Sequence, residues 1–523
     1  MAAVPAQRPP RPAGPGPVLP AVAGRSVPRA VPSAGFDPSA GFDPSSGFGP
    51  VPGPAAGAGP AGAPPEPAAV VLPWAAGPAW TPAPPAEEPV RIECVPWLPG
   101  TEAESAEAAA RRELKAVRYL FWHGRVAEGT AALERFQAGQ PAGAEPAGLR
   151  ELRSWLGYWF RSLFPQPGPA AGAGTTDGLA VLGGLLAGLP AEESVLKAER
   201  ILRDGRLGGG SVESLTSALT VLVYADRADR AARWCEPIAA RTAAANCSST
   251  WHALFSALRA EVALRQGDLR TAEEAARAAF ARIRPEGWGV AVGYPLSTMI
   301  SVRTALGRHE DAARYLALAV PAETFQTPAG LHYLYARGGH LLAVGRPEEA
   351  LADFRACGEL MARWDVDHLP GLVPWRVGAA RAELALGRRG PAVALADRQL
   401  AALGPAGHSR VRGMALRARA AAGEPAERTG LLERAVSALE DAGDSAQLAA
   451  ALGELSATHR VQGELGLARS AERRARPGGL QSARPGGPRP LPADPPAAPP
   501  AGRGRVPAGR PGGGPPAAGG VFN

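Results

Sequence analysis

Apolar side chains recur every three or four residues along most of the chain between about residues 91 and 475, the spacing of one face of an α-helix. In the stretch GRPEEALADFRACGEL (345–360), the apolar positions are Ala350, Leu351, Phe354, Cys357 and Leu360. In TWHALFSALRAEVALRQG (250–267), they are Trp251, Phe255, Leu258 and Val262. The pattern therefore predicts amphipathic helices, with Phe354 in the core.

A turn glycine follows these helices at regular intervals. The glycines are Gly267, Gly307, Gly345, Gly387, Gly423 and Gly463, separated by 40, 38, 42, 36 and 40 residues. Asp226 holds the same place 41 residues before Gly267, which makes seven units. Glycine suits such a position because the residue after a helix often adopts a left-handed conformation that disfavours a Cβ. Each unit is therefore predicted to be two helices joined at this turn.

A small residue sits at a fixed place in the second helix of most units. An alanine stands five positions after the turn residue, as Ala231, Ala272, Ala312, Ala350, Ala392 and Ala468. Gly423 departs from this rule, because Arg428 stands five positions after it. We expect the alanines to let the paired helices approach closely, and the unit at Gly423 to be the weakest copy.

Helix pairs of about 39 residues stack into solenoids whose core runs between neighbouring units. The sequence thus predicts an all-α protein, with a tetratricopeptide-like (TPR-like) α-solenoid over residues 178–475. Residues 91–165 are predicted to form the first helix pair or pairs, about Gly124. The segment GLRELRSWLGYWFRSLF (148–164) is amphipathic; we expect its apolar face to pack in the core, and contact with a membrane surface is the less favoured alternative.

The whole chain contains 65 Gly and 56 Pro, which are unevenly spread, and composition divides the parts outside the predicted helices. Residues 1–90 and 476–523 are rich in Ala, Pro, Gly or Arg and are expected to be disordered, because they cannot bury enough apolar area to offset backbone ordering. Residues 166–177 are expected to be a linker. A hexad of the form GFDPSA, which recurs in variant copies at Gly35, Gly41 and Gly47, is interpreted as low-complexity sequence rather than a recognition motif.

Net charge is +7, and residues 471–523 carry eight arginines against Glu472 and Asp494. Such a basic tail could bind nucleic acid weakly through phosphates. A solvated tail is the favoured interpretation, because arginine is enriched everywhere and Lys115 and Lys197 are the only lysines.

Residues able to carry chemistry are scattered. The cysteines Cys94, Cys235, Cys247 and Cys357 form no CxxC pair, which argues against a disulfide framework and a zinc site. The histidines His123, His252, His309, His332, His340, His368, His408 and His459 form no HExxH motif. Neither lysine ends a phosphate-binding loop, and LTVLVYAD (219–226) reads as a helix in preference to a nucleotide-binding strand. We therefore predict no catalytic, cofactor-binding, metal-binding or DNA-binding residue and no enzymatic activity.

Two aromatic stretches interrupt the repeat and are the candidate binding surfaces. They are EGWGVAVGYP around Trp288 and LVPWR around Trp375. Packing between helices is the favoured alternative for both. The start of the chain has no charged-then-apolar signal pattern, and GLAVLGGLLAGL (178–189) is too short to span a bilayer, so we expect a cytoplasmic protein without membrane contact.

Residues 215–475 resemble the helical-repeat region of the large ATP-binding regulators of the LuxR family (LAL regulators) of actinobacteria. The matching text includes ALTVLVYADRADRAARWCE, LRAEVALRQGDLRTAEEAARAA, PEGWGVAVGYPL, GRPEEALADFRACGELMARW and LVPWRVGAARAELALGRR, and YLFWHGR near Tyr119 extends it. In that family, the repeats are a sensor between an ATPase and a promoter-binding helix-turn-helix. Neither of those modules can be placed here, so none of their residues is carried over.

The resemblance implies a sensor or protein-interaction segment that acts in transcription regulation, with a small effector or a protein partner on the repeat surface. DNA would be contacted only through a restored helix-turn-helix or weakly through the tail. Because ARSAERRA gives way abruptly to RPGGLQSARPGG after Ala475, we expect a truncated or frameshifted regulator. The alternative is a stand-alone TPR-like adaptor that binds protein partners and has no role in DNA binding.

Overall fold

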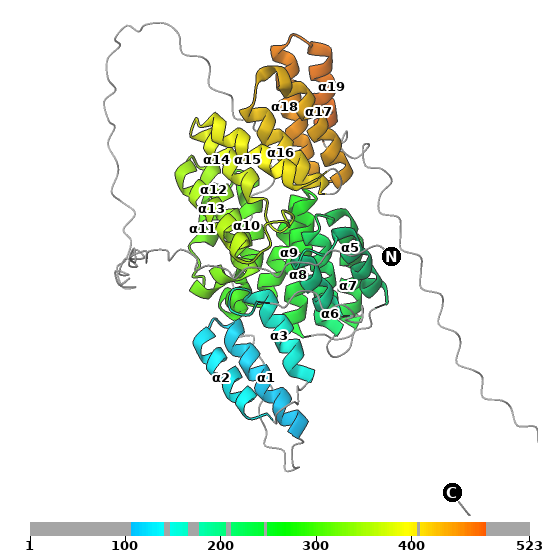
Figure 1. The fold of residues 1–523 in the computed structure, drawn as a ribbon. Coiled ribbons are helices and arrows are strands. Elements are labelled where there is room, and N and C mark those ends of the chain that lie inside the picture. The colour runs from blue at the N-terminus through cyan, green and yellow to red at the C-terminus, as the bar shows by residue number, and fades with distance from the viewer. Residues whose placement is uncertain are drawn as a thin grey trace, which may run out of the picture. The chain divides into compact units, whose positions relative to one another are not determined.

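The computed structural model describes residues 106–140, 147–165, 177–204, 211–244, 248–404 and 408–476. These residues form nineteen α-helices and two short 3-10 helices, and no strand occurs among them. Most helices pack against their neighbours in sequence, from α1 and α2 in blue to α18 and α19 in orange (Figure 1). The predicted all-α array of sequential helix pairs is therefore confirmed.

The helices before the predicted repeats are α1 (Ala106–Trp122), α2 (Val126–Ala138), α3 (Ala147–Trp159), α4 (Gly178–Leu186) and α5 (Ala191–Asp204). The seven predicted units are the pairs α6 (Ser211–Tyr224) and α7 (Ala228–Ala244), α8 (Ser249–Arg265) and α9 (Leu269–Arg282), α10 (Gly293–Ala305) and α11 (His309–Leu316), α12 (Pro328–Ala343) and α13 (Pro347–Arg363), α14 (Trp375–Ala385) and α15 (Arg389–Ala402), α16 (Ser409–Ala422) and α17 (Pro425–Ala442), and α18 (Ser445–Val461) and α19 (Leu465–Ala475). The 3-10 helices η1 (Pro285–Val292) and η2 (Ala322–Gln326) precede α10 and α12.

The turns within the pairs have the conformation that the glycines predict. Gly267, Gly307, Gly345, Gly387 and Gly463 have φ between 70° and 80°. Asp226 also adopts a left-handed conformation, with φ 61°. A left-handed residue stops the helix because its carbonyl no longer points along the helix axis, so the next helix starts in a new direction.

The alanine five positions after the turn is buried wherever it occurs. Six of these side chains are at most 1% exposed, namely Ala231, Ala272, Ala312, Ala350, Ala392 and Ala468. Phe354 is buried as predicted, and its ring fills a space made by two glycines. A Cβ added at Gly338 of α12 or at Gly378 of α14 would lie 2.9 or 2.5 Å from that ring. The glycines therefore let one phenylalanine join three consecutive helices.

The unit at Gly423 differs from the others, as its sequence indicates. Gly423 has φ −86° and ψ −168°, which is extended rather than left-handed. Arg428 occupies the alanine position, and its guanidinium donates hydrogen bonds to the carbonyls of Ala420 and Ala421. A further pair, α4 and α5, turns at Gly188 (φ 89°), 38 residues before Asp226, and was not predicted; Glu193 stands five positions after this turn in place of the alanine.

The predicted amphipathic helix is α3, and its apolar face is buried in the core. Leu149, Leu152, Leu156 and Trp159 are buried, whereas Leu163, just beyond the helix, is 47% exposed. These residues share one apolar cluster with helices α4 to α8 and with residues up to Val373. Core packing, and not a free membrane-facing surface, therefore explains the pattern. Within the described ranges, no helix is both long and apolar enough to cross a membrane.

Turns far apart in sequence also meet. The carbonyl of Gln266, in the turn between α8 and α9, accepts hydrogen bonds from the backbone N–H and the hydroxyl of Ser445, both at 3.0 Å. Asp226 Oδ2 accepts a hydrogen bond from the N–H of Val411 in the first turn of α16 at 3.1 Å. An acidic side chain satisfies a free N–H at a helix start. This contact explains why aspartate stands where other units have glycine.

Several predictions concern residues outside the described ranges. They are the disorder of residues 1–90 and 477–523, the GFDPSA hexads, the course of residues 166–176, and Cys94 and Cys247.

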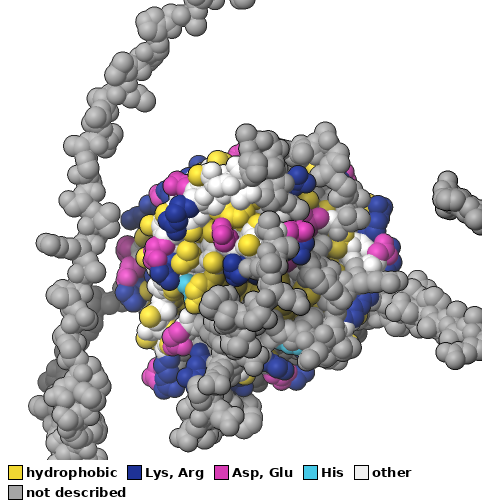
Figure 2. All heavy atoms as spheres, turned by 90° about the horizontal axis from the view of Figure 1, so that it is seen from below, with side chains coloured by type: hydrophobic (Ala, Val, Ile, Leu, Met, Phe, Trp, Pro, Cys, Tyr) yellow, Lys and Arg dark blue, Asp and Glu magenta, His cyan; other side chains and the backbone are white. Residues whose placement is uncertain are grey.

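Seen from below Figure 1, apolar side chains gather in the middle of the visible face, with charged side chains around them (Figure 2).

Candidate functional site: an aromatic cavity

A cavity of about 100 Å³ lies inside the first part of the array, between α1, α3, α4, α6, α8, α10 and α12. Its walls are mainly aromatic and aliphatic. The aromatic lining residues are Trp122, Trp155, Tyr158, Trp159, Tyr224, Trp251, Tyr294 and His332. Seven helices therefore contribute to one site, although their residues are dispersed over more than 200 positions of the sequence.

Two helices form the longest walls of the cavity. Helix α8 lines it with Trp251, Leu254, Leu258 and Glu261, which are spaced by three, four and three residues and so lie on one helix face. Helix α6 contributes two threonines whose hydroxyls are already used. Thr216 donates to the carbonyl of Val212 at 2.8 Å, and Thr220 donates to that of Thr216 at 2.9 Å.

Three tyrosine hydroxyls meet at the cavity. The hydroxyl of Tyr158 lies 2.6 Å from that of Tyr294 and 3.1 Å from that of Tyr224, and the last two are 3.1 Å apart. In a ring of three hydroxyls, each can donate one hydrogen bond and accept one. Burial raises the pKa of all three tyrosines, so they remain protonated and the ring is neutral.

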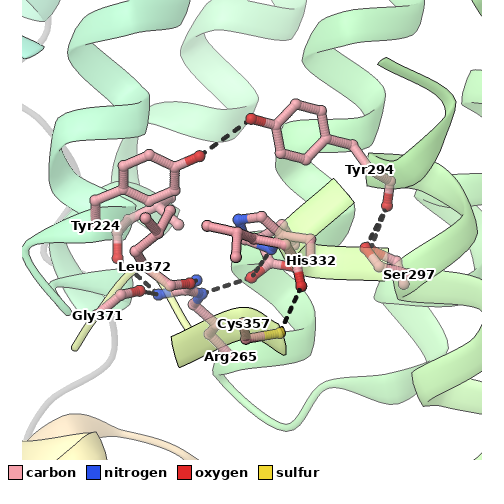
Figure 3. A network of polar contacts seen from close by, with 12 residues as sticks. Tyr224, Arg265, Tyr294, Ser297, His332, Cys357, Gly371 and Leu372 are labelled. Atoms are coloured by element: carbon pink, nitrogen blue, oxygen red, sulfur yellow. Dashed lines mark hydrogen bonds and ion pairs between the residues drawn. The ribbon is translucent and has the colours of Figure 1, made fainter. Parts of the chain in front are cut away.

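His332 of α12 lies beside these tyrosines. Its ring stacks on Tyr224 with centroids 5.9 Å apart and lies 5.2 Å from the ring of Tyr294 (Figure 3). Burial, opposed by the charge of Glu261, lowers the pKa of His332 to about 4, so the imidazole is neutral at pH 7. Its Nδ1 lies 3.7 Å from Oε1 of Glu261, whereas its buried Nε2 has no hydrogen-bond partner among the described residues.

Glu261 connects the histidine to a buried arginine. Arg265 Nε donates to Glu261 Oε1 at 2.6 Å. Burial acts to raise the pKa of Glu261, but the positive charge of Arg265 and the hydrogen bond from it outweigh this effect, so the pKa is lowered and the carboxylate is charged. Arg265 therefore fixes the negatively charged carboxylate of Glu261 beside Nδ1 of His332.

The same arginine binds three backbone carbonyls from two distant segments. Its guanidinium donates to the carbonyl of Val223 at the end of α6 at 2.8 Å, and to those of Gly371 and Leu372 between α13 and α14 (Figure 3). Charge-assisted hydrogen bonds of this kind are stronger than neutral ones. Arg265 therefore holds the end of α6 and the segment before α14 against α8.

An ion pair borders the cavity where it is most exposed. Arg118 of α1 binds Glu213 of α6 through both carboxylate oxygens, and its guanidinium lies 4.8 Å from the centre of the Trp155 ring. Both side chains keep substantial contact with solvent, unlike the inner lining. The pair therefore marks the mouth of the cavity.

The two aromatic stretches singled out from the sequence are packed rather than open. Trp288 is fully buried, and its Nε1 donates to the carbonyl of Ile283 at 3.0 Å. Trp375 donates to Asp367 at 2.9 Å and covers Gly358 of α13. Neither tryptophan reaches the cavity. The first stretch, however, also contains Tyr294, which does line it.

The scattered residues behave mostly as structural side chains. LTVLVYAD lies in α6 and its turn, so its helical interpretation is confirmed and the strand is excluded. Burial raises the pKa of Cys235 to about 12 and raises that of Cys357 further, which keeps both thiols protonated and unreactive. Among the described residues, no group of three or more His, Cys, Asp or Glu side chains is placed to hold a metal ion.

Sequence reasoning missed the cavity and treated His332 as one histidine among eight. One signal was present: six of the eleven tryptophans fall between residues 97 and 251, and four of the six line the cavity. No protein-family model and no curated protein matches the chain.

Proposed function

We propose that this chain is a helical-repeat sensor, similar to the sensor segment of the large ATP-binding LuxR-family regulators, and that a small effector binds in its aromatic cavity. The proposal combines the sequence resemblance over residues 215–475 with one structural observation. That observation is a mainly apolar cavity whose lining includes His332, a buried histidine whose Nε2 has no hydrogen-bond partner among the described residues. Concave apolar sites with a few polar groups are the usual form of small-molecule sites.

The output of such a sensor would be a change in helix stacking rather than a chemical reaction. An effector beside His332 would act on Glu261 and, through it, on Arg265, which holds Val223 and Leu372. Because Glu261, Arg265 and these carbonyls form one hydrogen-bonded network, and the imidazole of His332 packs 3.7 Å from Glu261, we expect a shift at the histidine to be transmitted to the end of α6 and the segment before α14.

A second contact would extend this change to the C-terminal pairs. Tyr224 of the hydroxyl ring stands two residues before Asp226, whose carboxylate binds the N-terminus of α16 at Val411. A movement of the α6 end would therefore change the position of α16. In the proposed regulator, this movement is the signal that alters transcription. We place the protein in the cytoplasm, in keeping with the free buried thiols of Cys235 and Cys357.

The proposal is tested by filling the cavity. Ala257 of α8 lines the cavity, and Ala257→Phe would occupy its volume; Ala352→Phe, at an exposed position of α13, is the matched control. Small hydrophobic metabolites are first screened against the full chain by thermal shift. We expect compounds that raise the melting temperature of the wild type and of Ala352→Phe but not that of Ala257→Phe.

The transcriptional part is tested in cells that carry the same two variants. We expect Ala257→Phe to change the level of specific transcripts and Ala352→Phe to leave them unchanged. Unchanged transcripts in Ala257→Phe cells and in cells that lack the protein, together with stable capture of a protein partner by both variants, would favour the stand-alone adaptor instead.

A further inference from the structure

The side chains that line the cavity restrict the chemistry of a molecule that could bind there. The inference drawn from them rests on the proposed function above. The volume of the cavity is about 100 Å³. An apolar cavity of about 150 Å³ is sufficient to bind benzene in a protein interior. The space here is smaller than that, so it limits the occupant to at most about one ring.

The walls favour an aromatic ring over an aliphatic group of the same size. Four tryptophans line the cavity, namely Trp122, Trp155, Trp159 and Trp251. They already pack edge to face with one another and with Tyr294, for example with 5.5 Å between the ring centres of Trp122 and Trp159. Aromatic pairs gain energy beyond their buried area in such arrangements. A ligand ring would continue this packing.

The charges near the cavity are already paired, which disfavours an ionic ligand. Glu261 is bound by Arg265, and Glu213 is bound by Arg118. A charge moved out of water into this space would find no free counter-charge among the described lining residues. Because the cost of burying an unpaired charge is large, the occupant should be neutral.

The histidine sets the polarity of the hydrogen bond that its own ring can offer. Its Nδ1 faces the charged carboxylate of Glu261, and the proton is therefore assigned to Nδ1, where it is attracted by that charge. Nε2 then carries a lone pair and can only accept. In Figure 3, the ring of His332 lies between Tyr224 and Tyr294.

The hydroxyl groups around the cavity do not donate a hydrogen bond to Nε2 of His332. The hydroxyls of Tyr158, Tyr224 and Tyr294 lie within hydrogen-bond distance of one another. Those of Thr216 and Thr220 are bound to helix carbonyls. A buried acceptor without a donor costs free energy, and a ligand that supplies the donor recovers it.

From these observations, we infer that the cavity binds a small neutral aromatic molecule with one hydrogen-bond donor, of which phenol is the simplest, and that the donor binds Nε2 of His332. The inference assigns His332 as the residue that sets specificity. Molecules of the same size that lack a donor should bind through the walls alone and therefore more weakly.

The test compares phenol and toluene as probes by calorimetric titration of the full chain. Wild type is measured beside His332→Leu and beside His340→Leu, a control on the same helix at a histidine that is equally buried and does not line the cavity. The ratio of the two affinities removes effects of the substitution on the walls. We expect the preference for phenol to fall about tenfold in His332→Leu, the equivalent of one hydrogen bond, and to stay within about twofold in His340→Leu.

A second measurement needs no variant, should His332→Leu fail to fold. Anisole keeps the ring and the oxygen of phenol but has no donor, so wild type should bind phenol about tenfold more tightly. Equal affinity for phenol and anisole, or an unchanged phenol preference in a folded His332→Leu, would overturn the donor assignment while leaving a ligand-binding cavity. Failure of phenol, toluene and anisole alike to bind would overturn the cavity as an effector site and the inference with it.

Discussion

The cavity half of the described chain, helices α1 to α13, and the regular half, helices α14 to α19, follow the same helix-pair pattern with different cores. Buried side chains of the cavity half include many large rings, such as Phe121, Phe160, Trp155, Trp159 and Trp288. The cluster at the end of the regular half contains only Ala, Leu and Val, such as Ala451, Leu439 and Leu452.

The difference shows how one repeat pattern gives both a scaffold and a site. Small aliphatic side chains let helices pack closely and fill the space between them. In the cavity half, seven helices whose facing side chains include many rigid rings leave a space between them. The cavity half also contains η1, η2 and the irregular segment between α13 and α14, whose carbonyls bind Arg265. These irregular segments therefore lie in the half that contains the candidate site.

The largest effect is expected where the two halves join. Phe354→Ala removes a ring packed against Gly338 of α12 and Gly378 of α14 and should lower the free energy of unfolding by about 3–5 kcal/mol. Val461→Ala, at a side chain that is 90% exposed, should change it by less than about 0.5 kcal/mol. Urea unfolding followed by circular dichroism measures both, and similar losses would show that the ring is not part of the core.

The next largest effect is expected from replacing a buried arginine, and we compare one such arginine from each half. Arg265→Met leaves Glu261 without its counter-charge and three carbonyls without a donor, so we expect a loss of about 3–5 kcal/mol. Arg410→Met in α16 removes the ion pair with Asp444, which keeps its bond from the N–H of Gln447, so the loss should be about 1–3 kcal/mol. Denaturant unfolding of the two variants decides the order. Equal losses would mean that Arg265 does not join separate segments.

A smaller effect is expected in how the free energy of unfolding changes as the pH falls, because of His332 in the cavity half. The unfolded chain takes up a proton at His332 near pH 6.5, whereas in the folded protein burial lowers the pKa to about 4. Between these values the unfolded state binds more protons, so stability is lost as the pH falls through this window. The contribution of His332 is roughly 3 kcal/mol at most.

His332→Leu should therefore lose less stability than wild type between pH 6.5 and pH 4, when both are unfolded in urea at a series of pH values. Measurements at pH 8 give the baseline, because the ring is neutral there in both states. The burial of His408 in the regular half also lowers its pKa, so part of the slope should remain in the variant. Parallel pH curves for wild type and variant would contradict a buried neutral His332.

The smallest effect is expected on the surface. Arg346 and Glu349, at the start of α13, form a 2.6 Å ion pair with both side chains 55% exposed. Solvent screens such pairs, so Arg346→Ala should change the free energy of unfolding by less than about 0.5 kcal/mol. A loss comparable to that of Arg410→Met, measured in the same urea series, would show that exposed pairs and not the core support the stacking.

The sequence was sufficient to predict the features that depend on residues close together in the chain. Helix faces, the left-handed turns at Gly267 or Gly345, and the buried alanines all follow from spacing within one unit. The departure at Gly423 was visible too, because Arg428 breaks the local rule. These features need no knowledge of how the units bend.

The site could not be predicted in the same way. The tyrosine hydroxyls meet across separations of 66, 70 and 136 residues, and no local pattern marks them. The role of Asp226 depends on Val411, which is 185 residues away. Such contacts depend on the bending of the whole array, a sum of small rotations between units that the repeat pattern does not specify.

The most direct test of the account is a crystal structure of the chain soaked with 4-bromophenol, in which anomalous scattering locates the bromine. We predict the ring inside the aromatic cavity, with the phenol oxygen within about 3.2 Å of Nε2 of His332. Bromine found only elsewhere, for example in the open groove lined by Arg381, Arg417 and Glu454, with the aromatic cavity empty, would contradict it.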